Sequence, residues 1–325
     1  MEQPLFQNRI DLSQLQQAVS NIKTEINKII VGQDEMIELL IAAILADGHV
    51  LIEGVPGVAK TLTAKLLSRT MSVQFSRIQF TPDLMPSDII GTSIFNLKTS
   101  EFEFKAGPLF SNIVLIDEIN RAPAKTQSAL FEAMEERQIT VDGKTYQLSP
   151  PFIVLATQNP VEQEGTYRLP EAQLDRFIFK IEVDYPSLED ETKIISDYHT
   201  RKNSIDLTSV NSVLNASDVK NYRDKVGEIH IEANLISYIA KIVNQTRNNS
   251  ALYLGASPRA SLSILTSSKA IAAMRGRDFV TPEDIKFVAT PVLKHRVMLT
   301  PEKEMEGLTA TEIIKQIIEK IEIPR

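Results

Sequence analysis

The sequence predicts an α/β fold with a parallel β-sheet, followed by a second domain that is mostly helical. Three observations support this fold class. Short apolar runs, typical of buried strands, alternate with segments of helical periodicity between residues 49 and 183. A glycine-containing turn at residues 54–61 joins the first of these runs to a helix. After Tyr185-Pro186 the strand-like runs stop, and helical periodicity continues to the end of the chain.

The first part of the chain shows each element in turn. Apolar residues at three- and four-residue steps predict helices over 12–30 and around 36–44, and further helices over 60–70 and from Pro123 to Glu136. Strands are expected at 49–53, within 73–80, and at 113–117, 152–157 and 177–183. Two hairpins are expected at 94–104 and 138–148, the second with Asp142-Gly143 as its two-residue turn.

The second part of the chain is expected to contain helices only. Their predicted spans are 187–200, 217–226, 231–248, 257–275, 282–297 and 309–321. The segment Thr281-Pro282-Glu283-Asp284 is a helix start, with a threonine cap, proline in the first turn and acids near the positive end. We therefore predict two domains, residues 1–186 and residues 187–325.

The turn at residues 54–61 has the composition of a phosphate-binding loop. It reads Gly-Val-Pro-Gly-Val-Ala-Lys-Thr. Its N–H groups and the following helix N-terminus can bind phosphate oxygens, Lys60 can reach the β- and γ-phosphates, and Thr61 can bind Mg²⁺. Ala59 replaces the usual second glycine, which costs about 1 kcal/mol if φ is positive there and little if the position is helical. The alternative is a surface turn that carries Lys-Thr by chance. The residues assigned to nucleotide binding are Gly54, Val55, Pro56, Gly57, Val58, Ala59, Lys60, Thr61 and Leu62.

A second polar group follows the apolar run 113–116. Asp117 and Glu118 end this run, and in a parallel sheet they would emerge at the carboxyl edge, where ligands bind. Asp117 is placed to hold Mg²⁺, and Glu118 is placed to orient and deprotonate the attacking water. The alternative is a strand end with a solvated acidic turn.

Composition excludes several other kinds of chemistry. The 325 residues include no cysteine, so disulfides, thiolate metal sites and cysteine nucleophiles are excluded, and the four scattered histidines are expected to be structural or exposed. A net charge of −7 disfavours a general nucleic-acid binder. No apolar stretch reaches the roughly 18 residues of a membrane span, and the N-terminus lacks a signal-peptide pattern. We expect a cytoplasmic protein.

Further segments, taken in their order and spacing, resemble the MoxR group of AAA+ ATPases, which are relatives of the magnesium-chelatase motor subunit. The match spans about residues 30–300 and is carried by the segments 31–33, 54–61, 79–88, 115–121, 133–138, 156–160, 169–177 and 255–260. The resemblance implies a P-loop AAA+ core with strand order 5-1-4-3-2, followed by an all-α lid domain. It also implies ATP/ADP and Mg²⁺ as cofactors.

The resemblance assigns roles to five more residues. Asn159 is similar to the polar residue that senses the γ-phosphate, although a turn asparagine before proline is the alternative. Arg176 resembles the arginine finger that reaches the next subunit, and an ion pair with Asp175 or Glu171 is its alternative. Arg259 resembles the lid arginine, with a solvated helix arginine as the alternative. The remaining two, which resemble adenine-side contacts, are Val31 and Gly32.

The function implied is an ATPase that works as a homo-oligomeric ring, expected to be a hexamer. Such a ring would remodel or activate a partner protein, a client or a von Willebrand A-domain protein. Two other functions remain open: a nucleotide-gated scaffold with little turnover, and a nucleic-acid motor. The residues leave the client, the ring size and the choice between cis and trans action of Arg259 undecided.

Overall fold

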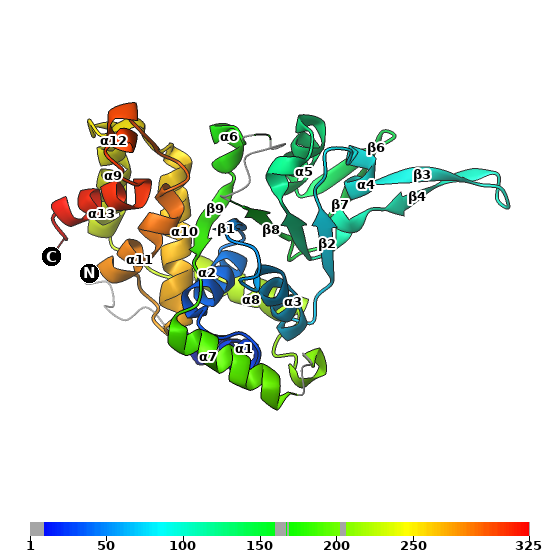
Figure 1. Cartoon of the computed structure of the whole chain (residues 1–325), viewed down its shortest axis with the longest axis horizontal. Helices are drawn as coiled ribbons and strands as arrows, with labels where there is room; N and C mark the ends of the chain where they lie inside the picture. Colours follow the sequence, from blue (N-terminus) through cyan, green and yellow to red (C-terminus); the bar gives the residue numbers. More distant parts are fainter. Residues whose placement is uncertain (1–9, 160–166, 168, 202–205, 325) are drawn as a thin grey trace, which may run out of the picture.

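The computed structural model of the chain describes residues 10–159, 167, 169–201 and 206–324. Its centre is a parallel five-stranded sheet in the order β2-β5-β8-β1-β9 (Figure 1). This confirms the expected order 5-1-4-3-2. The strands are β1 (His49–Gly54), β2 (Phe75–Gln79), β5 (Ile113–Asp117), β8 (Ile153–Gln158) and β9 (Phe177–Val183).

The sheet is covered on both faces, which explains why its central strands β1, β5 and β8 are mostly apolar and buried. Successive residues of a strand point to opposite faces, and in β5 Ile113 and Leu115 enter one core while Val114 and Ile116 enter another. The first core contains side chains of α1 (Ser13–Asn27), α2 (Asp34–Leu45) and α3 (Lys60–Thr70). The second contains those of α4 (Pro86–Ile90) and α5 (Ala124–Glu136).

Both predicted hairpins are confirmed, and the first is longer than predicted. Their strands are β3 (Gly91–Asn96) with β4 (Glu101–Ala106), and β6 (Gln138–Val141) with β7 (Lys144–Gln147). Asp142 and Gly143 have φ values of 50° and 74°, as a turn with two left-handed residues requires. The β3–β4 hairpin extends from the body as a long arm (Figure 1). The rings of Phe104 and Tyr146 stack with centroids 4.3 Å apart and join the two hairpins.

The second part of the chain is mostly helical, as predicted, but it also contains a small sheet that was not expected. The helices are α7 (Leu188–Thr200), α8 (Ala216–Gly227), α9 (Ala233–Arg247), α10 (Pro258–Met274), α11 (Pro282–Leu293), α12 (Pro301–Met305) and α13 (Ala310–Lys320). The antiparallel strands are β10 (Leu252–Leu254) and β11 (Met298–Leu299). The prediction of no further strand was wrong, because strands of two or three residues are too short to show a period.

Short helical turns complete the fold. They are η1 (Pro108–Phe110), η2 (Ile119–Arg121), α6 (Glu171–Leu174) and η3 (Leu207–Ser209). Thr281 caps α11 as predicted, in a capping box with Asp284. Within the described residues, no helix is both long and apolar enough to cross a membrane.

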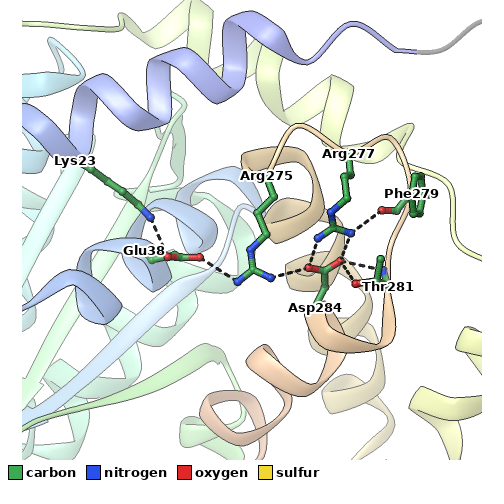
Figure 2. A network of polar contacts seen from close by, with 7 residues as sticks. All are labelled: Lys23, Glu38, Arg275, Arg277, Phe279, Thr281 and Asp284. Atoms are coloured by element: carbon green, nitrogen blue, oxygen red, sulfur yellow. Dashed lines mark hydrogen bonds and ion pairs between the residues drawn. The ribbon is translucent and has the colours of Figure 1, made fainter. Parts of the chain in front are cut away.

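A polar network fastens the helical part to the N-terminal helices (Figure 2). Lys23 of α1 pairs with Glu38 of α2 at 2.8 Å, and Glu38 also accepts from Arg275 at 3.4 Å. Arg275 and Arg277 then both bind the fully buried carboxylate of Asp284, at 3.0 and 2.6 Å. The first apolar core likewise continues from α1 and α2 into α8, α9, α10 and α11. The boundary between residues 186 and 187 therefore stays a prediction, because the two parts share one core.

Candidate nucleotide-binding site

The loop at residues 54–61 connects β1 to α3, and Lys60 is the first residue of that helix. Gly57 has a φ of +89°. Ala59 is the N-cap, with φ 60° and ψ 19°, so it lies in the left-handed region. This answers the question that the sequence left open: the position has positive φ, and the alanine methyl costs about 1 kcal/mol there. A side chain at Gly54 would meet the carbonyl of Val183 on the neighbouring strand at 2.6 Å.

The side chain of Lys60 turns back toward the start of the loop. Its Nζ donates to the carbonyl oxygen of Gly54 at 2.5 Å. Partial burial lowers the pKa of Lys60, and the negative charges of Asp117 and Glu118 act in the opposite direction. The ammonium is thus already close to the two acids and to the concave side of the loop, where a phosphate would need it.

Asp117 is buried at the carboxyl end of β5 and has two polar partners. The Nε of Arg77 lies 2.5 Å from its Oδ2, and the Thr157 hydroxyl donates to its Oδ1 at 3.3 Å. The oxygen donors of Thr61 and Asp117 fit Mg²⁺, which prefers hydroxyl, carboxylate and phosphate oxygens. The prediction that these groups share one edge of the sheet is therefore consistent with the geometry.

Glu118 follows Asp117 with a φ of 58°, a left-handed conformation that is unusual for a residue other than glycine. Its Oε2 accepts from the Nε2 of Gln79 at 2.7 Å and from the Nε of Arg121 at 3.0 Å. Its backbone N–H donates to the Thr157 hydroxyl at 3.0 Å. Two side chains therefore orient the carboxylate, and the backbone bond fixes the position of the residue. Backbone outliers of this kind cluster at functional sites.

The residues that contact the two acids, Arg77, Gln79 and Thr157, were not predicted from the sequence. The spacing of Arg77 and Gln79 was a signal that could have identified two of them. Arg77 and Gln79 are two apart in a strand, so they lie on one face, and Gln79 is the register partner of Asp117. Thr157 precedes the last residue of β8, which lies between β1 and β5. Asn159 follows this strand directly and so lies at the same edge of the sheet, as predicted.

A cavity of about 330 Å³ adjoins the loop. It is lined by Val31 together with Val58, Ala59 and Leu62 of the loop and helix, and by Ile194 and Tyr198 of α7. Gly32 is not among its lining residues. Gly32 has a φ of +72°, and a side chain there would meet Asp190 at 2.6 Å. Its predicted contact with the adenine side stays a prediction. The apolar wall from α7 was not predicted, because its residues are distant in sequence.

Arg176 and Arg259 lie at the amino ends of the strands, opposite the carboxyl edge that carries the loop. Arg176 directly precedes β9, whose first residue pairs with His49, the first residue of β1. The six residues of β1 separate this edge from the loop by about 17–20 Å. Arg176 pairs with Glu135 at 2.7 Å, rather than with Asp175 or Glu171 as the alternative had it. Arg259 binds the other oxygen of the same carboxylate at 2.7 Å.

Comparisons with known proteins agree with this geometry. The ATPase family associated with various cellular activities (AAA) matches residues 49–179, and the AAA lid domain matches residues 244–317. The chain is 46% identical over 299 residues to the uncharacterized protein YeaC of Bacillus subtilis, with 92% of each chain covered. It is 42% identical over 310 residues to the chaperone MoxR1 of Mycobacterium tuberculosis, covering 93% of this chain and 81% of that protein.

A solved structure shows the same fold. The crystal structure of a candidate ATPase from Cytophaga hutchinsonii has a TM-score of 0.88 and 44% sequence identity to this chain. The match covers 95% of this chain and 96% of that one. With a P-loop, an acidic strand end, a lid and these relatives, the chain belongs to the MoxR-type AAA+ ATPases.

Proposed function

We propose that the protein binds ATP with Mg²⁺ at residues 54–61 and hydrolyses it. The observation that carries this proposal is the meeting of three groups at one edge of the sheet. The loop follows β1, Asn159 follows β8, and Glu118 follows Asp117, the last residue of β5. These three strands are adjacent. Ligands of open α/β sheets bind at this carboxyl edge.

Each side chain has a separate task in the proposed reaction. Lys60 and the N–H groups at the start of α3 bind the β- and γ-phosphates. Val31 and the loop contact the nucleotide on its adenine side. Thr61 and Asp117 would hold Mg²⁺, which supplies neutralisation of the phosphate charge. Glu118 accepts a proton from the attacking water, and Asn159 hydrogen-bonds the γ-phosphate or that water.

We further propose that the site is completed by a neighbouring copy of the chain. Arg176 and Arg259 lie at the sheet edge opposite the loop, so neither is placed to reach the phosphates of its own subunit. A head-to-tail ring would bring this edge of one subunit to the nucleotide of the next. This supports action in trans for both arginines, and it supports a homo-oligomeric ring, which we expect to be a hexamer.

The work of the ring is proposed to be the remodelling or activation of a partner protein in the cytoplasm. The Mycobacterium tuberculosis relative is named a chaperone, which supports this class of function. The β3–β4 arm exposes 86% of Leu97 and 72% of Phe102, and such apolar groups suit contact with a client or with a von Willebrand A-domain protein. A nucleic-acid motor is disfavoured by the net charge of −7, and a scaffold by the complete set of hydrolytic residues.

Nucleotide binding and hydrolysis can be measured separately to test this function. Lys60→Ala should lose ATP binding, because the phosphates lose their cation. Glu118→Gln should bind ATP and retain it unhydrolysed, because the base is removed while a neutral isostere stays. ATP binding with no turnover by the unaltered protein at any concentration, with or without partner, would favour the scaffold. Stimulation of its turnover by DNA or RNA would favour the motor.

A further inference from the structure

A single carboxylate joins Arg176 and Arg259, the two arginines that we propose act on the nucleotide of a neighbouring subunit. Glu135 lies in the last turn of α5, and its Oε2 and Oε1 accept from Arg176 and Arg259, each at 2.7 Å. The arginines come from different parts of the fold, one from the start of β9 and the other from the start of α10. The side chains of Glu135, Arg176 and Arg259 are 39%, 30% and 44% exposed, so the cluster faces solvent.

The cluster lines a cavity of about 290 Å³ whose wall holds four arginines and three acids. Two more arginines line this cavity, and each pairs with an acid other than Glu135. Arg137 pairs at 3.3 Å with Asp47, which Arg223 also binds at 2.8 Å, and Arg296 pairs with Asp175 at 2.7 Å. Glu135 is therefore the acid shared by Arg176 and Arg259. The buried Nε of Arg176 has no hydrogen-bond acceptor among the described residues, so one N–H donor of this guanidinium is unused.

A phosphate group would satisfy this pair of guanidiniums better than the carboxylate does. It offers three acceptor oxygens and up to about two negative charges, against two oxygens and one charge on a glutamate. Partly exposed ion pairs are individually weak, so a neighbour that brings a phosphate can displace the carboxylate.

We infer that Glu135 occupies, in the free protomer, the place that the terminal phosphate of the neighbouring subunit's nucleotide takes in the assembled ring. The inference rests on the proposed action of Arg176 and Arg259 in trans. Glu135 then keeps both arginines together and charge-compensated, and it must be displaced when two subunits associate around ATP. Glu135 is thus a positioning residue that opposes assembly, and its removal makes the interface easier to form.

The dependence of ATPase activity on protein concentration tests this role. Glu135→Gln keeps the shape of the side chain but weakens both ion pairs. We expect the protein concentration at half-maximal specific activity to fall by roughly three- to tenfold, with the plateau unchanged. Glu135→Ala should shift the midpoint in the same direction. Glu136→Gln is the matched control, because it makes the same charge change at the next, exposed position of the helix and should leave the curve unchanged.

The possible outcomes separate this inference from the proposed function. A lower plateau or a higher midpoint for Glu135→Gln would show that Glu135 supports the arginines in the active ring, and an unchanged curve would show no role in assembly. Either result overturns the inference. Arg176→Ala is measured alongside, and if it hydrolyses ATP at the parent rate at every concentration, the action in trans fails instead. Thermal unfolding of each variant confirms that it is folded.

Discussion

Arg77 and Asp117 form an ion pair across β2 and β5, with the Nε of Arg77 2.5 Å from the Oδ2 of Asp117. The arginine thus binds the same carboxylate that is proposed to bind Mg²⁺. Two cations that need the same carboxylate compete for it, so this pair weakens metal binding.

Removing the competing cation should therefore strengthen Mg²⁺ binding. Arg77→Gln is expected to lower the Mg²⁺ concentration for half-maximal ATPase activity by severalfold, in a titration at fixed ATP. Lys65→Gln, which makes the same charge change on the exposed side of α3, is the control. A variant that needs more Mg²⁺ than the parent would show that Arg77 holds Asp117 in the shape that binds the metal.

The left-handed conformation of Ala59 leads to a second prediction. Ala59→Gly removes the steric cost of the methyl group and should stabilise the folded protein by up to about 1 kcal/mol, less the extra entropy of glycine in the unfolded chain. ATP binding should tighten as well, because the loop is no longer strained. Chemical denaturation and nucleotide titration measure the two effects.

The same substitution inside α3 should have the opposite sign. Ala64 is fully buried inside the helix, and Ala64→Gly there is expected to destabilise the protein by about 1 kcal/mol. If Ala59→Gly were destabilising too, the methyl of Ala59 would be stabilising contacts in the loop that outweigh its strain.

His49 makes the stability of the protein depend on pH. Val154 donates to its Nδ1 at 2.9 Å, so its Nε2 carries the proton that is donated to the Met134 carbonyl at 3.1 Å. Burial, and then the charge of Arg137, lower the pKa of His49 from 6.5 to about 3. Below pH 6.5 the unfolded chain binds a proton that the folded protein excludes until about pH 3, so stability falls as the pH falls through this window.

The expected loss from His49 is about 2 kcal/mol between pH 7 and pH 5. His49→Gln removes this titration while keeping an N–H donor, so its free energy of unfolding should change less between these two pH values. The exposed His199 provides the control, since His199→Gln should leave the pH dependence of the parent. Equal slopes for the parent and His49→Gln would mean that the imidazole is already charged in the folded state.

The network of Figure 2 is expected to determine how firmly the lid is attached. Asp284→Ala would leave Arg275 and Arg277 without their shared acid and remove the capping box of α11. We expect a loss of about 3 kcal/mol in the free energy of unfolding. Glu283→Ala, at the adjacent exposed position, should cost far less. Similar losses for the two variants in urea unfolding would show that the network contributes little.

The sequence predicted those parts of the fold that depend on local patterns. The span of β9, residues 177–183, agrees because three apolar residues continue into an alternation of polar and apolar residues that ends at Val183. The turn at Asp142-Gly143 agrees because few residues other than these tolerate two successive left-handed conformations. The strands β10 and β11 were missed because each depends on a partner more than 40 residues away.

The site was predictable in its elements but not in its contacts. The loop and the acidic strand end are continuous in sequence, so their chemistry could be read directly from neighbouring residues. The partner of Arg176 could not be predicted in this way, because Glu135 is 41 residues away and meets Arg176 only when α5 packs beside β9. Whether Ala59 is helical or left-handed is a difference in the φ and ψ of one residue, which residue type alone does not determine.

The most direct test of the account is whether an active site is assembled from two subunits. Arg176→Ala and Glu118→Gln should each hydrolyse ATP poorly alone, because one lacks the finger and the other lacks the base. Mixed in equal amounts, about a quarter of the interfaces would pair an intact Glu118 with an intact Arg176 if subunits fill the ring at random. The account predicts that the mixture is several times more active than either variant at the same total concentration. A mixture no more active than its two components would contradict it.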